Sequence, residues 1–363
     1  MSGVDASEAL LSTVEKSVAY ECTGTHLLPW PRLMFSLGVL EMNAITASSE
    51  IPRREFLRRS TLLAATGTML GCATSTTLTR PIPAIDTHTH FYDPTRKGGV
   101  PWPPPDDSLL YRRVMPTECK SLAQPLGVKG TVVVEASPLE EDNQWILNLA
   151  DTDRFILGFV GHLKPGRPNF RKQLDRFGEH PLFKGIRIGG WGVAIEPQST
   201  AYIADLKRLA DRHLVVDVII SPDQLPTVAQ LAQALPSLRI VINHVANVRI
   251  NGERPPESWV LGMKACSAHP HVYCKVSALV EGTQKSHQDA PKTVDFYRPV
   301  LDAVWEMFGE DRVIYGSNWP VSERFADYAT VHRIVENYFL EKGGHIPEKF
   351  LRSNAQKIYR LSP

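Results

Sequence analysis

The sequence predicts an α/β protein whose catalytic domain is a (β/α)8 TIM barrel. Eight short apolar segments rich in β-branched residues recur between positions 84 and 316, and helical patterns fill the gaps between them. This alternation is typical of a parallel sheet, and eight such units suggest a closed barrel. Ionisable side chains also gather where the segments end. An open doubly wound sheet is the alternative, but no Gly-x-Gly-x-x-Gly follows the first segment.

The size and charge of the chain limit the classes of function. Its 363 residues can hold one large α/β domain or two ordinary ones. Lys and Arg number 40 against 39 Asp and Glu, a formal net charge of +1, so the composition favours a small-molecule partner over nucleic acid. Five cysteines show no Cys-x-x-Cys spacing, which argues against a zinc ribbon, a redox dithiol or a disulfide scaffold. We expect most of them to be buried thiols.

A candidate export signal lies at residues 51–80, after an irregular segment at 1–50. Residues 53–60 read Arg-Arg-Glu-Phe-Leu-Arg-Arg-Ser, and a weakly apolar run and three small residues follow them. This arrangement resembles a twin-arginine signal peptide, and a basic amphipathic surface helix is the alternative. Because such signals are N-terminal, we expect translation to start at Met42.

Two modes of cleavage are open for this signal. Met-Leu-Gly-Cys at residues 69–72 resembles a lipoprotein box, and acylation of Cys72 would attach the protein to a membrane by lipid alone. Ordinary cleavage after Ala73 is the alternative. Either mode places the protein in the periplasm or cell envelope, with the functional domain at residues 81–363.

The expected elements alternate along this domain. The expected strands share an apolar, β-branched composition and lie at 84–89, 130–136, 155–161, 183–188, 214–220, 239–244, 272–276 and 312–316. The expected helices lie at 140–150, 169–177, 200–212, 224–235, 257–268, 294–308 and 326–340. Ser221 and Pro222 form an N-terminal cap for the fourth helix, and Pro236 ends it.

The first strand ends in two histidines one residue apart. Side chains alternate between faces along a strand, so Asp86, His88 and His90 project to the same side. The two imidazoles are then close enough to share one cation, which indicates a metal or catalytic site. A surface strand that happens to carry two histidines is the alternative.

Chemically useful side chains also end the later strands. They are Glu135, Arg187, Asn243, His244, Lys275, Ser277 and the run Ser317-Asn318-Trp319-Pro320. Because barrel enzymes build their active sites at the carboxyl ends of the strands, we expect these residues to converge. The loop after strand one, at residues 91–111, carries Trp102 among four prolines and suits a substrate lid. The alternative is that this loop has no function.

Three of these residues have candidate roles. His244 could serve as a metal ligand or general base, or as a structural histidine bonded to a loop carbonyl. Arg187 suits a carboxylate or a developing oxyanion, although a buried ion pair with Glu135 or Asp217 is an equal alternative. Lys275 is open between a substrate contact and a hydrogen bond inside the barrel.

The motifs together resemble the amidohydrolase-related family, in the branch of predicted metal-dependent TIM-barrel hydrolases that includes sugar-lactone lactonases. The resemblance covers about residues 81–361 and rests on Ile-Asp-Thr-His-Thr-His-Phe at 85–91, Lys-Gly-Ile-Arg at 184–187, Ile-Asn-His at 242–244, Tyr-Cys-Lys-Val-Ser-Ala-Leu at 273–279 and Tyr-Gly-Ser-Asn-Trp-Pro-Val at 315–321. It implies a hydrolase with one divalent metal ion, or chemistry that needs no metal. His88 and His90 would be ligands of such an ion, with Glu135 or His244 as the third.

Two positions depart from the family pattern. Strand eight of relatives ends in an aspartate that binds the metal and acts as general base, whereas this chain has Asn318, whose amide does not take a proton near neutral pH. The strand-five histidine is also absent, and only Asp217 stands there. With two ligands fewer, we expect zinc to be weakly held or dispensable. We expect Asn318 and Trp319 to bind substrate instead.

The sequence therefore predicts an exported hydrolase that opens a lactone or related cyclic ester of a small polar acid. Arg187 and Lys275 would polarise the carbonyl group, and His244 would activate water. A decarboxylase of the same family is one alternative. The other is a small-molecule-binding barrel that lost its chemistry with Asn318.

Overall fold

The computed structural model describes residues 81–190 and 194–362, which form the predicted parallel barrel. The eight strands are β1 (Ala84–Thr89), β2 (Val128–Val134), β3 (Ile156–Gly161), β4 (Phe183–Ile188), β5 (Val215–Val218), β6 (Arg239–Ile242), β7 (Val272–Val276) and β8 (Val313–Tyr315). Each pairs in parallel with the next in sequence order. The backbone N–H group of His90 donates to the Trp319 carbonyl at 2.9 Å, and the backbone N–H group of Asn318 donates to the His88 carbonyl at 2.9 Å. These bonds bring the end of β8 back to β1.

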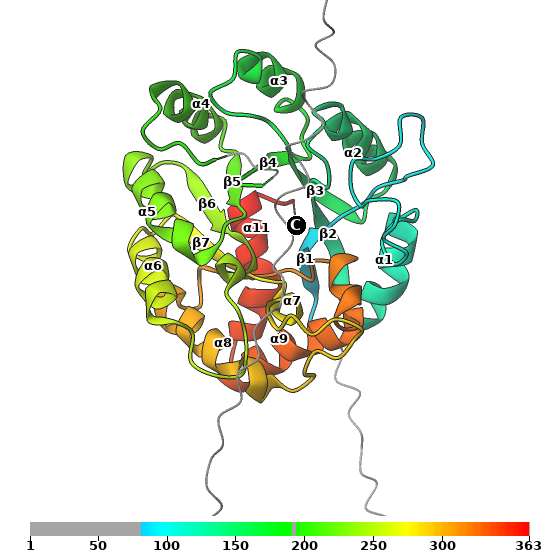
Figure 1. Cartoon of the computed structure of the whole chain (residues 1–363), viewed down its shortest axis with the longest axis vertical. Coiled ribbons are helices and arrows are strands. Elements are labelled where there is room, and N and C mark those ends of the chain that lie inside the picture. The colour runs from blue at the N-terminus through cyan, green and yellow to red at the C-terminus, as the bar shows by residue number, and fades with distance from the viewer. Residues whose placement is uncertain (1–80, 191–193, 363) are drawn as a thin grey trace, which may run out of the picture. The chain divides into compact units, whose positions relative to one another are not determined.

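Helices surround the strands, apart from α11 (Asn354–Tyr359), which lies at the centre of the ring (Figure 1). They are α1 (Pro116–Ala123), α2 (Glu141–Thr152), α3 (Phe170–Phe177), α4 (Thr200–Asp211), α5 (Leu225–Ala234), α6 (Glu257–Ser267), α7 (Leu279–Gly282), α8 (Val294–Phe308), α9 (Tyr328–Lys342), α10 (Ile346–Glu348) and α11 (Asn354–Tyr359). All seven expected helices form, within two residues of their expected bounds. The sequence did not reveal α1, since it buries only Pro116, Cys119 and Ala123 and lacks a strong apolar stripe.

The barrel interior is a separate apolar core from the layer between strands and helices. Its members from the strands are Ile85, Val132, Val134, Val160, Val215, Val241, Tyr273 and Ile314. Helix α11 adds Ala355, Ile358 and Tyr359, and it lies at the centre of the ring in Figure 1. Lys184 and Arg239, at the starts of β4 and β6, donate to carbonyl groups at residues 357–360. Helix α11 therefore closes the amino-terminal end of the barrel, and the opposite end is left for a site.

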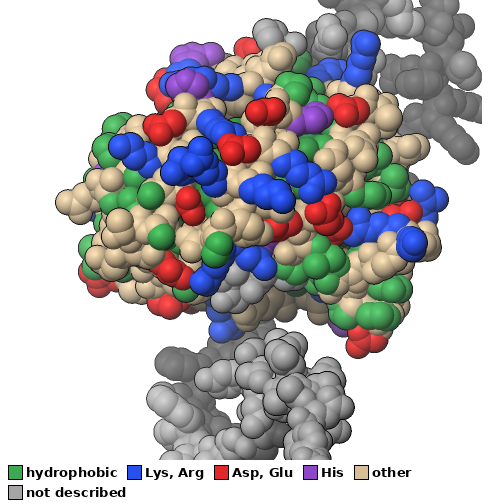
Figure 2. Space-filling view, turned by 90° about the horizontal axis from the view of Figure 1, so that it is seen from above, with side chains coloured by type: hydrophobic (Ala, Val, Ile, Leu, Met, Phe, Trp, Pro, Cys, Tyr) green, Lys and Arg blue, Asp and Glu red, His purple; other side chains and the backbone are tan. Residues whose placement is uncertain are grey.

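The molecular surface carries mixed charges. Basic and acidic side chains are interspersed over the face drawn in Figure 2, without a large area of one sign.

Within residues 81–190 and 194–362, no helix is long and apolar enough to cross a bilayer. Cys119, Cys266 and Cys274 are buried free thiols, as expected. The predicted signal at 51–80, with Cys72, and the predicted start at Met42 lie outside the described residues.

Candidate active site

A cavity of about 380 Å³ opens at the carboxyl ends of the strands. This volume is within the range of small-molecule sites. Its lining includes His90, Arg187, His244 and Asn318, which the sequence predicted to converge, and Trp102 from the loop after β1. Glu281 also lines the cavity and was not among the predicted residues. The structure thus brings side chains from four strand ends and two loops to one place.

Left-handed turns end three of the strands that carry these residues. The φ angles are 55° at His244, 51° at Ala278 and 60° at Asn318. Non-glycine residues seldom adopt this conformation, which costs on the order of 1–3 kcal/mol per residue and is concentrated at functional sites. After β6 the left-handed run continues through Val245 to Asn247. This turn ends β6 two residues earlier than the sequence predicted.

Three histidines lie together, and two of them, His90 and His244, line the cavity. The ring centroid of His88 is 5.0 Å from that of His90 and 4.3 Å from that of His244. Burial is the main cause that lowers the pKa of each ring, and the positive charges of Arg187 and Lys275 lower these pKa values further. The pKa of His90 falls to about 3. All three rings are therefore neutral imidazoles at physiological pH.

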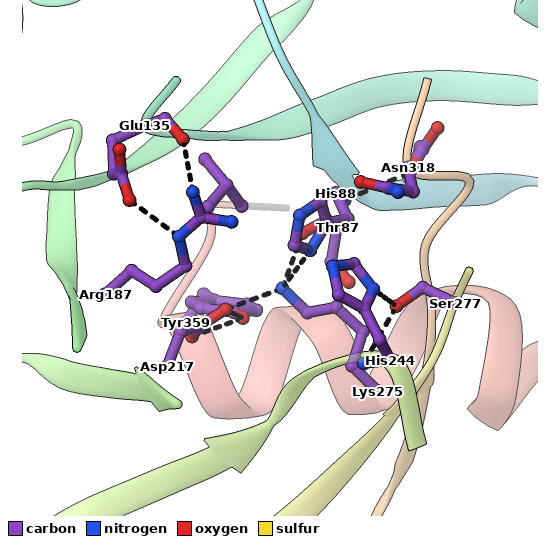
Figure 3. A network of polar contacts seen from close by, with 12 residues as sticks. Thr87, His88, Glu135, Arg187, Asp217, His244, Lys275, Ser277, Asn318 and Tyr359 are labelled. Carbon is purple, nitrogen blue, oxygen red and sulfur yellow. Dashed lines mark hydrogen bonds and ion pairs between the residues drawn. The ribbon is translucent and has the colours of Figure 1, made fainter. Parts of the chain in front are cut away.

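Arg187 forms a buried ion pair with Glu135, one of the alternatives that the sequence left open (Figure 3). Arg187 Nε lies 2.6 Å from Glu135 Oε1, and Arg187 Nη2 donates to the Glu135 carbonyl at 2.9 Å. The Ser137 amide donates to Glu135 Oε2 at 3.0 Å. Both carboxylate oxygens of Glu135 are thus engaged, and the pair holds the guanidinium at the cavity wall.

Lys275 lies inside the barrel, and its side chain is fully buried. Its ammonium group donates to Asp217 Oδ2 at 2.7 Å and to the Thr87 carbonyl at 2.8 Å, and it lies 3.4 Å from His88 Nδ1 (Figure 3). Tyr359 of α11 donates its hydroxyl to Asp217 Oδ1 at 2.9 Å. Burial lowers the pKa of Lys275, and the Asp217 carboxylate opposes this shift. Lys275 is not part of the cavity lining, and it makes hydrogen bonds inside the barrel, which was one of the two alternatives that the sequence left open.

Trp319 is also placed differently from expectation. Its side chain is fully buried, its ring centroid is 6.2 Å from that of Phe91, and its indole nitrogen donates to Glu323 Oε1 at 2.6 Å. Because Trp319 packs in the core and does not line the cavity, the structure does not support the substrate contact that the sequence suggested.

The predicted metal ligands do not fit a tightly held cation as they are arranged. Nδ1 of His90 lies 2.9 Å from the Val134 carbonyl oxygen, its Nε2 lies 3.2 Å from Asn318 Oδ1, and Glu135 is engaged by Arg187. His88 Nε2 alone among these ligand atoms is buried without a hydrogen-bond partner. Across the described ranges, no group of three or more His, Cys, Asp or Glu side chains is arranged to hold a metal ion. A catalytic zinc normally takes three protein ligands.

Glu281, from the short helix α7, is the functional candidate that sequence reasoning missed. The Asn318 side-chain amide donates to Glu281 Oε1 at 2.9 Å, and Oε2 is buried without a hydrogen-bond partner. Burial raises the pKa of this carboxyl group to about 7. The signal that could have found it is an acidic residue five positions after the end of β7, in a loop that a barrel directs to its active site.

Comparison with known proteins gives a consistent family. Residues 85–361 match the sequence model of the amidohydrolase family. An L-fucono-1,5-lactonase of Burkholderia ambifaria is 32% identical over 256 residues, which are 67% of this chain and 83% of that protein.

Solved structures share the fold. An amidohydrolase from Burkholderia multivorans with bound HEPES aligns with a TM-score of 0.69 and 22% identity, over 77% of this chain and 100% of that one. A second structure of an amidohydrolase from Burkholderia multivorans, with bound zinc, aligns with a TM-score of 0.66 and 22% identity, again over 77% of this chain and 100% of that one. At this identity the likeness supports the barrel fold and carries no assignment of substrate.

Proposed function

This chain belongs to the amidohydrolase family and is a hydrolase, and from that premise we propose that it opens the ring of a sugar lactone or a related lactone of a small polar acid. The observation that carries the proposal is the cavity in which Arg187, His244, Glu281 and Asn318 converge. The B. ambifaria relative, an L-fucono-1,5-lactonase by name, supports the choice of a lactone.

The proposed chemistry assigns each polar group a task. Arg187, held by Glu135, stabilises the negative charge that develops on the carbonyl oxygen when water attacks. Ser277 Oγ lies 2.8 Å from His244 Nδ1 and fixes that ring, so its other nitrogen can orient the attacking water. Asn318 is placed to bond a substrate hydroxyl or carbonyl group. Lys275 is a positioning residue that holds His88 from beneath.

A panel of lactones tests this proposal directly. We expect L-fucono-1,5-lactone or another aldonolactone to release acid, measured with a pH indicator, and His244→Ala to reduce kcat/KM by at least about 100-fold. His287→Ala changes an exposed histidine outside the cavity and is the matched control. If no lactone is hydrolysed but an aromatic carboxylic acid loses carbon dioxide, the activity is that of a decarboxylase. Tight lactone binding without turnover in the wild type would instead indicate a binding barrel.

We also propose that a divalent metal ion is weakly held or dispensable in this protein. The family is typically metal-dependent, and a zinc-bound structural neighbour exists. In this chain, however, the strand-eight carboxylate is replaced by Asn318, and Arg187 and Lys275 already place positive charge beside the histidines. A dication beside the histidines would lack the strand-eight carboxylate, and Glu135 is already engaged by Arg187.

Export to the periplasm or cell envelope, directed by residues 51–80, is our proposal for localisation. It is supported by the paired arginines at 53 and 54, the short apolar run that follows and the small residues at 71–73. Acylation of Cys72 would make the membrane a partner through lipid alone.

A further inference from the structure

Glu281 has a carboxyl group without a cation to balance it. Among the described residues no ion pair involves Glu281, and its one side-chain hydrogen bond is the 2.9 Å contact from Asn318. The charged or titratable groups around it are Arg187, His90 and His244 on the same cavity wall, and the phenol of Tyr297 on α8, whose pKa rises mainly by burial and also by the charge of Glu281. A buried carboxyl group in such a setting is costly to ionise and takes up a proton readily.

The Asn318 side-chain amide can hydrogen-bond to either protonation state of Glu281, and it satisfies His90 at the same time when Glu281 is protonated. The Val134 carbonyl accepts only, so the proton of a neutral His90 ring lies on Nδ1 and its Nε2 is an acceptor. The NH2 group of Asn318 satisfies that nitrogen, and the Asn318 oxygen then faces Glu281, where a carboxylic acid can donate to it. Rotation of the amide by half a turn presents the NH2 group to an ionised Glu281, as in the 2.9 Å contact. The Asn318 oxygen then faces the acceptor Nε2 of His90 at 3.2 Å, so this orientation gains one hydrogen bond and gives up the other. An aspartate at position 318 would offer only the acceptor.

We propose that Glu281 is the general base and acid of the reaction, and that it takes over the proton transfer that the missing strand-eight carboxylate performs in relatives. Asn318 is the positioning residue that follows the proton by turning its amide. This inference rests on the proposed lactone hydrolysis and names the proton-transfer residue that the sequence analysis left unassigned. A pKa near 7 is suited to both halves of such a proton transfer.

The proposed step balances in protons and bonds. Ionised Glu281 removes one proton from water while the water oxygen bonds to the lactone carbonyl carbon, and the carbonyl oxygen becomes an oxyanion near Arg187. The bond between that carbon and the ring oxygen then breaks, and protonated Glu281 returns its proton to the leaving alkoxide. The product is a hydroxy acid, which ionises to solvent and leaves Glu281 as a carboxylate.

Two substitutions of Glu281 test this role in the full-length protein. We expect Glu281→Gln to keep the hydrogen bond with Asn318 and the KM for the lactone, and to lower kcat by at least about 100-fold. Glu281→Asp retains the carboxyl group and should recover part of kcat. The wild-type kcat should rise with pH through about 7, as the base ionises, and the Gln variant should lack this rise. Glu253→Gln, on the exposed surface, is the matched control.

A second readout does not depend on turnover. The ordinary pKa of a glutamic acid is 4.5, and in the folded protein the pKa of Glu281 is about 7. Between these two pH values the folded state binds more protons than the unfolded state, so the wild type should lose stability relative to Glu281→Gln as the pH rises from 4.5 to 7. Urea unfolding at pH 4.5 and pH 8 measures the difference. Full kcat in Glu281→Gln would overturn the inference. If the wild type hydrolyses no lactone, the proposed function fails, and the unfolding measurement alone tests Glu281. A difference in the free energy of unfolding between wild type and Glu281→Gln that does not change with pH overturns its role as proton acceptor. A difference that changes with pH supports that role.

Discussion

At the scale of single residues, the ion pair of Lys275 with Asp217 is both fully buried and fully partnered. Lys275→Met leaves the Asp217 carboxylate without its cation, and we expect a loss of about 3–5 kcal/mol in the free energy of unfolding. The double variant Lys275→Met with Asp217→Leu removes both charges, so it should be more stable than the single one. Urea denaturation at pH 7 measures this, with exposed Lys264→Met as control. Equal stability of Lys275→Met and the wild type would show that the cation of Lys275 is not needed to balance the buried Asp217 carboxylate.

A second expectation at this scale concerns metal. If the cation is dispensable, chelation should leave lactone turnover unchanged, and Asn318→Asp should bind zinc more tightly because it adds an anionic ligand. Metal content by mass spectrometry, with activity before and after chelation, measures both. The proposal that metal is dispensable would be wrong if the protein contains stoichiometric zinc and its removal abolishes turnover.

Individual site residues were predictable to different degrees. Strand parity and the strand-end rule placed His90, His244 and Asn318 at the cavity, because a short apolar strand fixes where its side chains point. The rule left two alternatives for Lys275, and the structure places this residue, one position before the end of β7, inside the barrel. Glu281 lies in a loop helix without periodicity, so its burial and its contact with Asn318 required the three-dimensional structure.

At the scale of elements, two strand glycines differ in what a methyl group would meet. A Cβ at Gly185 of β4 would lie 2.0 Å from the Val215 carbonyl oxygen of β5, and a backbone atom in a sheet has little room to move. A Cβ at Gly158 of β3 would meet Lys184 Cγ at 2.6 Å, and a side-chain atom can shift further than a backbone atom in a sheet. We expect Gly185→Ala to cost about 3 kcal/mol and Gly158→Ala clearly less, as measured by urea unfolding. The reverse order would refute this packing argument.

The strands and major helices could be read from the sequence because their apolar periods are regular. The bounds of β1, β4, β7 and α8 match expectation without change. Strands β5 and β6 end earlier than expected, and after β6 the cause is a left-handed turn at non-glycine residues, which no local propensity indicates. Helix α11 was not expected because its role depends on a barrel interior formed by residues far away in sequence.

At the scale of the whole molecule, the export proposal concerns the full chain. We expect replacement of Arg53 and Arg54 by lysine to leave the protein in the cytoplasm, because the paired arginines are what the signal would present. Cell fractionation with an antibody against the barrel measures this. N-terminal sequencing or mass spectrometry of the wild type should find a start at Cys72 or Thr74. Exported protein that still carries residues 1–80 would refute the signal.

The closed end of the barrel has a consequence for the order in which the protein is made. Residues 354–361 leave the ribosome after all eight strands, yet Tyr359 supplies a hydroxyl group to Asp217 beneath the histidines. A nascent chain that has released β8 but not α11 therefore has every cavity residue but lacks the hydroxyl group that Tyr359 gives to Asp217. Tyr359 therefore joins Asp217 only after the strands that build the cavity have been synthesised.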